Sequence, residues 1–97
     1  MQYNCDWDPK KAQINKEKHE VTFEEAASVF LDPRMLTIYD TDHSEQEERW
    51  VTLGLSDKGR LLLVYHTFRE EKSTTAIIRI FSSRKATKQH AKQYQET

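Results

Sequence analysis

Apolar and polar positions along this chain follow two different periods. Between about residues 9 and 31 the apolar positions recur at helical spacing, and between residues 35 and 82 they follow the alternation of extended strands. Short polar or turn-forming stretches interrupt the second region. The pattern predicts two helices, then four strands, and a further helix near the C-terminus.

The first helix is predicted to begin at an aspartate followed by a proline. Asp8 is a good N-cap, Pro9 fits the first helical position, and helix-forming residues continue to about His19. The helical face that begins at Ala12 is otherwise polar and includes Asn15. We therefore expect this helix to be partly exposed.

The second helix start is a threonine with a glutamate three residues later. Thr22 and Glu25 have the spacing of a capping box. Phe23 and Phe30 fall on one helical face, so this helix should contribute to the core. It should end before Asp32, because the residue preceding a proline is disfavoured in helical conformation.

The strands are rich in β-branched, aromatic and leucine residues. They are expected at residues 35–39, 49–55, 60–68 and 75–82. Short separators between them favour antiparallel hairpins, residues 2–7 offer one more strand at an edge, and Ser82 or Ser83 can cap a last helix. The predicted fold class is α+β, with an antiparallel sheet of four to five strands, two N-terminal helices and one C-terminal helix.

Length and composition narrow the class of protein. A chain of 97 residues, 36% hydrophobic and 32% charged, has room for one domain, residues 1–97, with a thin core. The single cysteine, Cys5, has no partner for a disulfide or a spaced metal site, which favours a reducing cytoplasm. There is no apolar signal core, and the longest apolar run, residues 61–65, is too short to span a bilayer. We expect no contact with a membrane.

Charge is segregated along the chain, although the formal net charge is only -1. Residues 79–97 contain one acid, Glu96, and five cations: Arg79, Arg84, Lys85, Lys88 and Lys92. Residues 40–48 contain no Lys or Arg and five acids: Asp40, Asp42, Glu45, Glu47 and Glu48. The acidic run is typical of a solvated loop, whereas the basic end has two alternative interpretations.

Arg79 lies within an apolar strand and needs a partner. Strand alternation places it on the same face as Ile77 and opposite to Ile78. Its partner is either an acid, in a buried or half-buried ion pair, or a phosphate, which suits the planar guanidinium. Arg84 and Lys85, near the expected helix start, strengthen the phosphate interpretation.

The four histidines do not form a recognisable metal motif. Their spacing fits no zinc site, and the two glycines leave no Gly-rich phosphate loop, so we expect no metal and no cofactor. His66 lies within a strand and is best explained as a core histidine with satisfied hydrogen bonds. Lys18 and His19 close the first helix, where cations complement the helix dipole.

Taken together, eight short motifs in one order resemble the BrnT-type ribonuclease toxins. They are WDPKK (7–11), N-x-x-KH (15–19), VTFEEA (21–26), VF-x-DP (29–33), D-x-x-H-S (40–44), ER (48–49), GRLL (59–62) and R-I-x-S-x-R-x-A-T (79–87). The resemblance implies a compact RelE/ParE-like domain that cleaves RNA without a metal and halts translation. It also implies a BrnA-type antitoxin, which forms a hetero-oligomer with the toxin and supplies the only contact with DNA.

The resemblance further implies roles for individual residues. Arg79 and Arg84 would stabilise the phosphate and the transition state, with Arg49 and Arg69 as further candidates. For proton transfer, three residues compete and the sequence does not choose among them: His19, Lys18 and His66. The cations expected to draw in RNA or antitoxin are Lys85, Lys88 and Lys92.

This chain also departs from the family pattern. Glu20 stands where the family usually has glycine, and residues 88–94 lack the family's usual glutamate. The alternative to an enzyme is a non-catalytic module that pairs with a DNA-binding antitoxin in an autorepressor complex.

Overall fold

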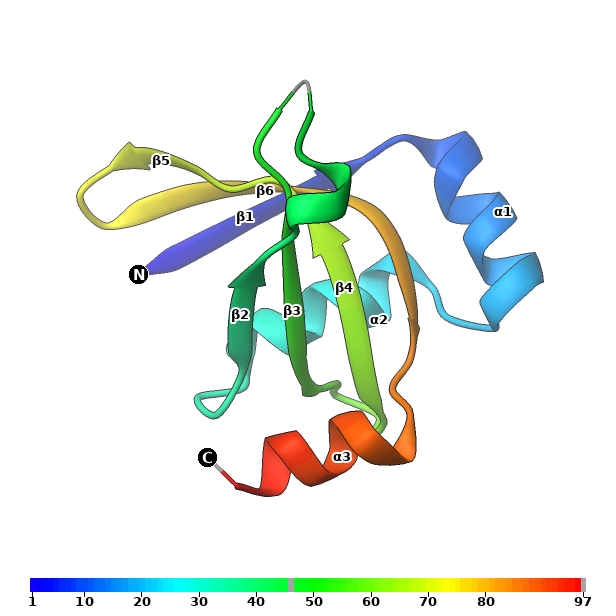
Figure 1. Cartoon of the computed structure of the whole chain (residues 1–97). Helices are drawn as coiled ribbons and strands as arrows, with labels where there is room; N and C mark the ends of the chain where they lie inside the picture. Colours follow the sequence, from blue (N-terminus) through cyan, green and yellow to red (C-terminus); the bar gives the residue numbers. More distant parts are fainter. Residues whose placement is uncertain (46, 97) are drawn as a thin grey trace.

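The centre of the structure is a twisted sheet whose strands are not arranged in chain order (Figure 1). The computed structural model describes residues 1–45 and 47–96; Gln46, in the expected acidic loop, and Thr97, at the end of the expected domain, lie outside these ranges. The elements in chain order are β1 (Gln2–Trp7), α1 (Pro9–His19), α2 (Phe23–Ser28), the 3-10 turn η1 (Val29–Leu31), β2 (Leu36–Tyr39), the 3-10 turn η2 (Thr41–His43), β3 (Trp50–Leu55), β4 (Leu61–His66), β5 (Arg69–Lys72), β6 (Thr75–Lys85) and α3 (Lys88–Gln95).

The sheet order is β1-β6-β4-β3-β2, and β5 pairs with the first part of β6. The pairs β2–β3, β3–β4 and β4–β6 are antiparallel, as the short separators predicted, and β5–β6 is an additional antiparallel pair. β1 pairs with β6 in parallel, so the sheet is mixed. The α+β class is confirmed, while the parallel pair joins the two ends of the chain and no local turn signal could predict it.

Both predicted helix starts are confirmed by their caps. The Asp8 carboxylate accepts the N–H of Lys10 at 2.9 Å, and the Thr22 hydroxyl accepts the N–H of Glu25 at 3.1 Å. α1 ends at His19, and the next residue, Glu20, has a φ of 58°, in the left-handed region that favours glycine. The second helix ends with η1, before Asp32, as predicted.

The polar face of α1 is anchored rather than simply exposed. Asn15 is buried, and its amide donates to the carbonyls of Val21 (3.0 Å) and Ser83 (2.8 Å). Its own carbonyl accepts the N–H of Ser83 at 3.0 Å. One polar side chain therefore ties α1 to the α1–α2 connection and to β6.

The core lies between α2 with η1 and one face of the sheet. The buried apolar residues that form it are Val21, Phe23, Ala26, Val29, Phe30, Leu62, Val64, Ile78 and Ile80. Gly54 permits the close approach of β3 to η1, because a Cβ there would lie 2.7 Å from Val29 Cγ1. In the described part of the chain, no helix has the length and apolarity needed to cross a bilayer.

His66 belongs to this core, and its predicted structural role is confirmed. Its Nδ1 donates to the carbonyl of Thr67 (2.8 Å), so Nε2 accepts the hydroxyl of Thr52 (2.7 Å). Thr37 in turn donates to Thr52 (2.8 Å). Burial lowers the pKa of His66 to about 4, which keeps the imidazole neutral.

The last strands and the start of α3 differ from the prediction in four respects. β6 does not stop at Ser82 or Ser83 but continues to Lys85, because those residues keep pairing with β4. Thr87, not a serine, caps α3. Residues 69–72, expected as a turn, form β5 against β6, and the β4–β6 ladder contains a bulge where the register shifts between Tyr65 and His66.

Candidate functional site

The face of the sheet opposite α2, here called the open face, carries the candidate site. Because Leu62 and Val64 point into the core, their neighbours Leu63 and Tyr65 point to the open face. Cross-strand register extends this face over four strands in two rows. The first row is Leu36, Leu53, Leu63 and Arg84, and the second is Ile38, Val51, Tyr65 and Ser82.

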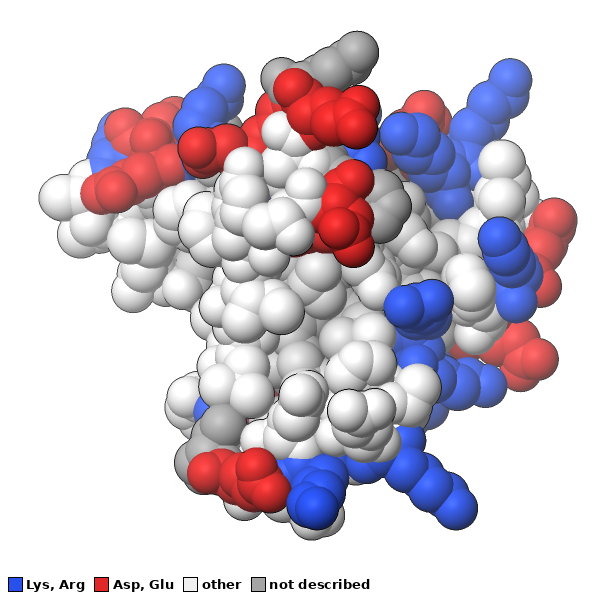
Figure 2. All heavy atoms as spheres, viewed as in Figure 1, with Lys and Arg blue, Asp and Glu red and all other residues white. Residues whose placement is uncertain are grey.

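The aliphatic and aromatic members of these rows form the floor of a hollow of about 450 Å³. Charged and polar residues line its margins: Asp40 and Asp42 at η2, Arg84 on β6, and His90 and Gln93 on α3. Figure 2 looks onto this face and shows an uncharged centre, with acids above and cations to the right and below. The hollow thus combines an apolar floor with a cationic end.

Arg84 is the cation of the hollow. Its guanidinium donates to the hydroxyl of Tyr65 at 2.8 Å and lies 5.5 Å from the centre of the tyrosine ring. Among residues 1–45 and 47–96, no acid forms an ion pair with Arg84. An arginine held in place by a neutral group keeps its charge available for an anion.

His90 enters the hollow through the cap of α3. It occupies the third helical position, where a capping box usually has glutamate, and its Nδ1 accepts the N–H of Thr87 at 3.2 Å. The same Nδ1 lies 2.9 Å from the Thr87 hydroxyl. The histidine therefore performs the capping task of the missing glutamate and leaves its Nε2 edge for other partners.

α3 is fixed at its far end by a tyrosine–aspartate hydrogen bond. The Tyr94 hydroxyl donates to Asp32 Oδ2 at 2.6 Å, and the N–H of Leu55 donates to the same oxygen at 2.8 Å. Burial opposes ionisation of Asp32, yet the hydrogen bonds from Tyr94 and Leu55 hold its pKa below the usual value. α3, and with it His90, is thereby positioned against the end of β3.

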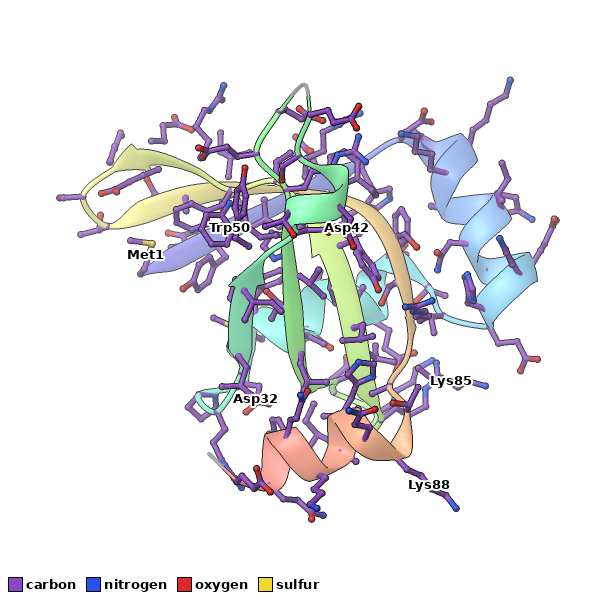
Figure 3. The ribbon with its side chains drawn as sticks, viewed as in Figure 1. Met1, Asp32, Asp42, Trp50, Lys85 and Lys88 are labelled. Carbon is purple, nitrogen blue, oxygen red and sulfur yellow. The ribbon has the colours of Figure 1, made fainter. Side chains whose placement is uncertain are left out.

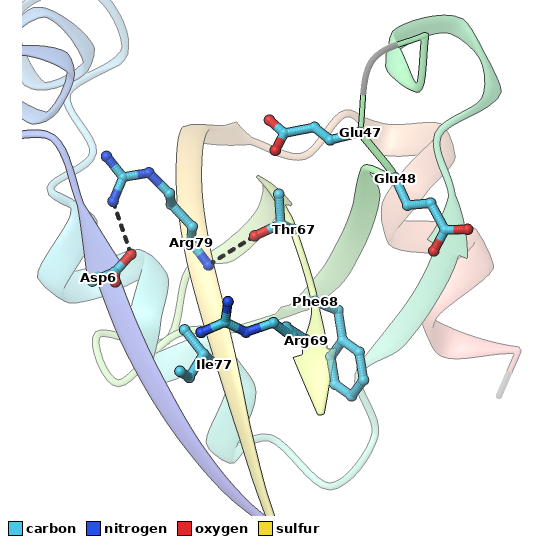
Figure 4. Close-up of a pocket in the computed structure, with 8 residues that line it drawn as sticks. All are labelled: Asp6, Glu47, Glu48, Thr67, Phe68, Arg69, Ile77 and Arg79. Carbon is cyan, nitrogen blue, oxygen red and sulfur yellow. Dashed lines mark hydrogen bonds and ion pairs between the residues drawn. The ribbon is translucent and has the colours of Figure 1, made fainter. Parts of the chain in front are cut away.

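Arg79 and Arg69 lie in a second depression, here called the cleft, of about 460 Å³ (Figure 4). Ile78 and Ile80 are buried in the core, so Arg79 points to the open face as predicted. It forms an exposed ion pair with Asp6 at 3.1 Å, and Arg69 extends toward its cross-strand neighbour Ile77. Glu47 and Glu48 also line the cleft, so its cations are surrounded by acids.

Arg49 lies outside the linings of the hollow and the cleft. Its guanidinium stacks on the ring of Phe81, 4.1 Å from the ring centre, and pairs with Glu47 at 3.5 Å. The ammonium of Lys11 lies 5.4 Å from the centre of the same ring. Arg49 is thus a neighbour of the cleft through Glu47.

The candidates for proton transfer do not meet these arginines. Lys18 and His19 close α1 and line neither depression, and both ring nitrogens of His66 are bonded within the core. The described residues contain no group of three or more His, Cys, Asp or Glu side chains arranged to hold a metal ion.

The remaining basic residues lie at the surface. Lys85 is 3.9 Å from Glu20, and Lys88 and Lys92 are exposed on α3, where Lys88 points away from the sheet (Figure 3). Their binding of RNA stays a prediction.

The sequence interpretation missed Tyr65 and the position of His90 beside Arg84. Strand alternation from Leu63 could have placed Tyr65 on the open face. The Thr87-x-x-His90 spacing could have indicated the true helix start. Their meeting with Arg84 depends on pairing between distant parts of the chain.

Comparison with known proteins agrees with the sequence resemblance. Residues 7–90 match the family described as "Ribonuclease toxin, BrnT, of type II toxin-antitoxin system". The structure resembles the crystal structure of the Brucella abortus ribonuclease toxin, BrnT, with a TM-score of 0.57 and 20% sequence identity; the match covers 91% of this chain and 100% of the Brucella chain. No curated protein matches the sequence. Because the family match extends over most of the chain, this protein belongs to the BrnT family of type II toxin–antitoxin ribonuclease toxins.

Proposed function

We propose that this toxin is a metal-independent endoribonuclease whose reaction takes place in the hollow on the open face. The observation that carries the proposal is Arg84, a cation without an acid partner among the described residues, held by Tyr65 in a hollow that His90 also lines. Cleavage of a phosphodiester needs a fixed cation and groups that transfer protons, and these three side chains supply both.

The proposed step is attack of a ribose 2′-hydroxyl on the adjacent phosphorus. His90 takes the 2′ proton at Nε2 in the tautomer that carries the ring proton on Nδ1. In that tautomer Nδ1–H donates to the Thr87 hydroxyl, 2.9 Å away, and the hydrogen bond from the Thr87 N–H to Nδ1 is given up. The 2′-oxygen bonds to phosphorus while Arg84 stabilises the charge on the phosphorane oxygens. The bond to the 5′-oxygen breaks, and that oxygen takes the proton of the Tyr65 hydroxyl. The products are a 2′,3′-cyclic phosphate and a 5′-hydroxyl end.

The other cations would bind RNA on either side of the reacting phosphate. Arg69 and Arg79 belong to the same face as Arg84 and could hold flanking phosphates. A phosphate at Arg79 would compete with Asp6 for the guanidinium. Arg49 would act from the border of the cleft. The exposed lysines of β6 and α3 would supply long-range attraction, which weakens as the salt concentration rises.

Cleavage of RNA in the cytoplasm would inhibit translation, and an antitoxin would neutralise it. Membership of a type II toxin–antitoxin family implies a protein antitoxin. We propose that this partner is of the BrnA type and forms a hetero-oligomer with the toxin. In that complex, DNA would be bound only through the antitoxin.

Single-turnover cleavage of a labelled RNA in the presence of EDTA tests the proposal. Arg84→Ala should lower the rate by about 10²–10³-fold, as loss of a transition-state donor does. His90→Ala should lower it by about 10²–10⁴-fold, the usual contribution of a general base. Gln89→Ala, an exposed neighbour on α3, is the matched control and should retain the wild-type rate.

Product analysis completes the test. The cut ends should carry a 2′,3′-cyclic phosphate, or the 3′-phosphate from its hydrolysis, and a 5′-hydroxyl. Wild-type protein that binds RNA or antitoxin but cuts no RNA would instead support the non-catalytic module. Cleavage that requires a divalent ion would contradict the proposed chemistry.

A further inference from the structure

The open face of the sheet is apolar and lacks a full cover. One face packs against α2 and η1, whereas the other is crossed by α3 near one end and bordered by η2 at the opposite end (Figure 1). Ile38 is 66% exposed, and its row-mates Val51 and Tyr65 are half-buried. A sheet with apolar side chains on both faces usually packs a layer on each.

The two ends of this apolar surface carry opposite charge. Arg84 lies on β6 in the row of Leu63 and has no ion pair to a described acid, whereas Asp42, within η2, lies toward the opposite ends of the strands (Figure 3). A segment that lay across the rows would meet a cation at one end, aliphatic and aromatic side chains in the middle, and a carboxylate at the other. That order of charges defines the chemistry of a complementary partner.

The size of the surface fits a short helix. A helix that lies across the rows runs along the strands, and β3 and β4 have six residues each, which span about 20 Å at about 3.3 Å per residue. About thirteen residues of helix have the same length at about 1.5 Å per residue. An amphipathic helix can set three or four apolar side chains on such a floor.

We propose that the neutralising segment of the antitoxin is an amphipathic helix that lies across the two rows of the open face. Its apolar side rests on Ile38, Val51 and Tyr65, an acidic residue pairs with Arg84, and a basic residue faces Asp42. The inference rests on the proposed function in one respect: the helix blocks cleavage because it covers Arg84 and His90. A protein segment suits the surface better than an RNA backbone does, because a polyanion gains little from aliphatic side chains and is repelled by Asp42.

The test is calorimetric titration of the full-length toxin with its full-length cognate antitoxin. Ile38→Asp should weaken binding at least tenfold, because it places a charge in the apolar centre of the contact. Ile14→Asp is the matched control: Ile14 is 60% exposed on α1, away from the hollow, and this change should leave affinity unchanged. Far-ultraviolet circular dichroism verifies that both variants are folded.

Hydrogen exchange of the wild-type complex gives a second measurement that needs no variant. The antitoxin should protect amides of β2 and η2 and leave those of α1 and α2 unchanged. Unaltered affinity of Ile38→Asp, an equal loss in Ile14→Asp, or protection confined to α1 and α2 would each overturn the proposal. So would a toxin dimer that Ile38→Asp dissociates while antitoxin affinity is retained, because the face would then serve self-association.

These measurements contain no RNA, so their outcome is independent of the cleavage assay. If binding fails to depend on Ile38 while wild-type toxin still cuts RNA, the docking inference alone is wrong. If binding depends on Ile38 but no cleavage occurs, the proposed function alone is wrong.

Discussion

Asn15 joins α1 to the strand that carries Arg84, and its removal should be costly. Asn15→Ala leaves three buried backbone groups without their partner: the Val21 carbonyl and both the carbonyl and the N–H of Ser83. Each unsatisfied buried group costs about 1–3 kcal/mol, less whatever relaxation or entering water recovers, so we expect a loss of roughly 3 kcal/mol. Stabilities of small domains are only about 5–15 kcal/mol, so this loss is a large fraction of the total.

Urea unfolding followed by tryptophan fluorescence measures this loss, and thermal unfolding should show a decrease in Tm of roughly 12–24 °C. Asn15→Asp should be at least as damaging, because its carboxylate retains the bond from the Ser83 N–H but faces two carbonyls with no proton to donate. Gln13→Ala changes an exposed amide on the same helix and should alter stability by less than about 0.5 kcal/mol. A loss below about 1 kcal/mol for Asn15→Ala would refute the reasoning, since the carbonyls would then be satisfied in another way.

Three further changes test other parts of the fold. Burial lowers the pKa of His66 from 6.5 to about 4, so the unfolded chain takes up a proton at a higher pH than the folded protein does. The free energy of unfolding should therefore fall by about 3 kcal/mol as the pH drops from 6.5 through 4. Urea midpoints measured across this range should depend less on pH in His66→Gln. Gly54→Ala would set a Cβ 2.7 Å from Val29 Cγ1 and should lower the free energy of unfolding by about 1–3 kcal/mol. An unchanged urea midpoint would show that η1 can move away from β3 without loss of stability. Glu20→Gly removes the strain of a side chain at a left-handed backbone position and should raise the free energy of unfolding by about 0.5–1 kcal/mol. A lower Tm would mean that contacts of the Glu20 side chain stabilise the fold by more than this strain costs.

Local chemistry explains why most elements could be predicted from the sequence. The caps at Asp8 and Thr22 act within three residues, so their side chains reveal where α1 and α2 begin. Strand alternation correctly placed Arg79 opposite to the buried Ile78. These features depend on neighbours in the chain and on the periods of helix and strand.

The parts that could not be predicted depend on contacts between distant residues. Residues 69–72 are charged and look like a turn, yet they form an edge strand, where charged residues protect an unpaired edge. Asn15 looked like an exposed helical residue until its partners on β6 were known. The grouping of Arg84 with Tyr65 and His90, and its separation from Arg79, follows from sheet register and the docking of α3.

The bulge between β4 and β6 decides which residues of β6 point to the open face, because it adds one residue to the alternation of the strand. Arg79 and Arg84 are five positions apart, and in an unbroken strand an odd separation sends two side chains to opposite faces. The register shift beside His66 leaves Phe81 as one extra residue, which restores the even count and brings both arginines to one face. Deleting Phe81 would therefore keep every cation in the sequence yet turn one of the two toward the core. A deletion of one residue in β6 would therefore disturb the open face more than substitution of several of its residues would.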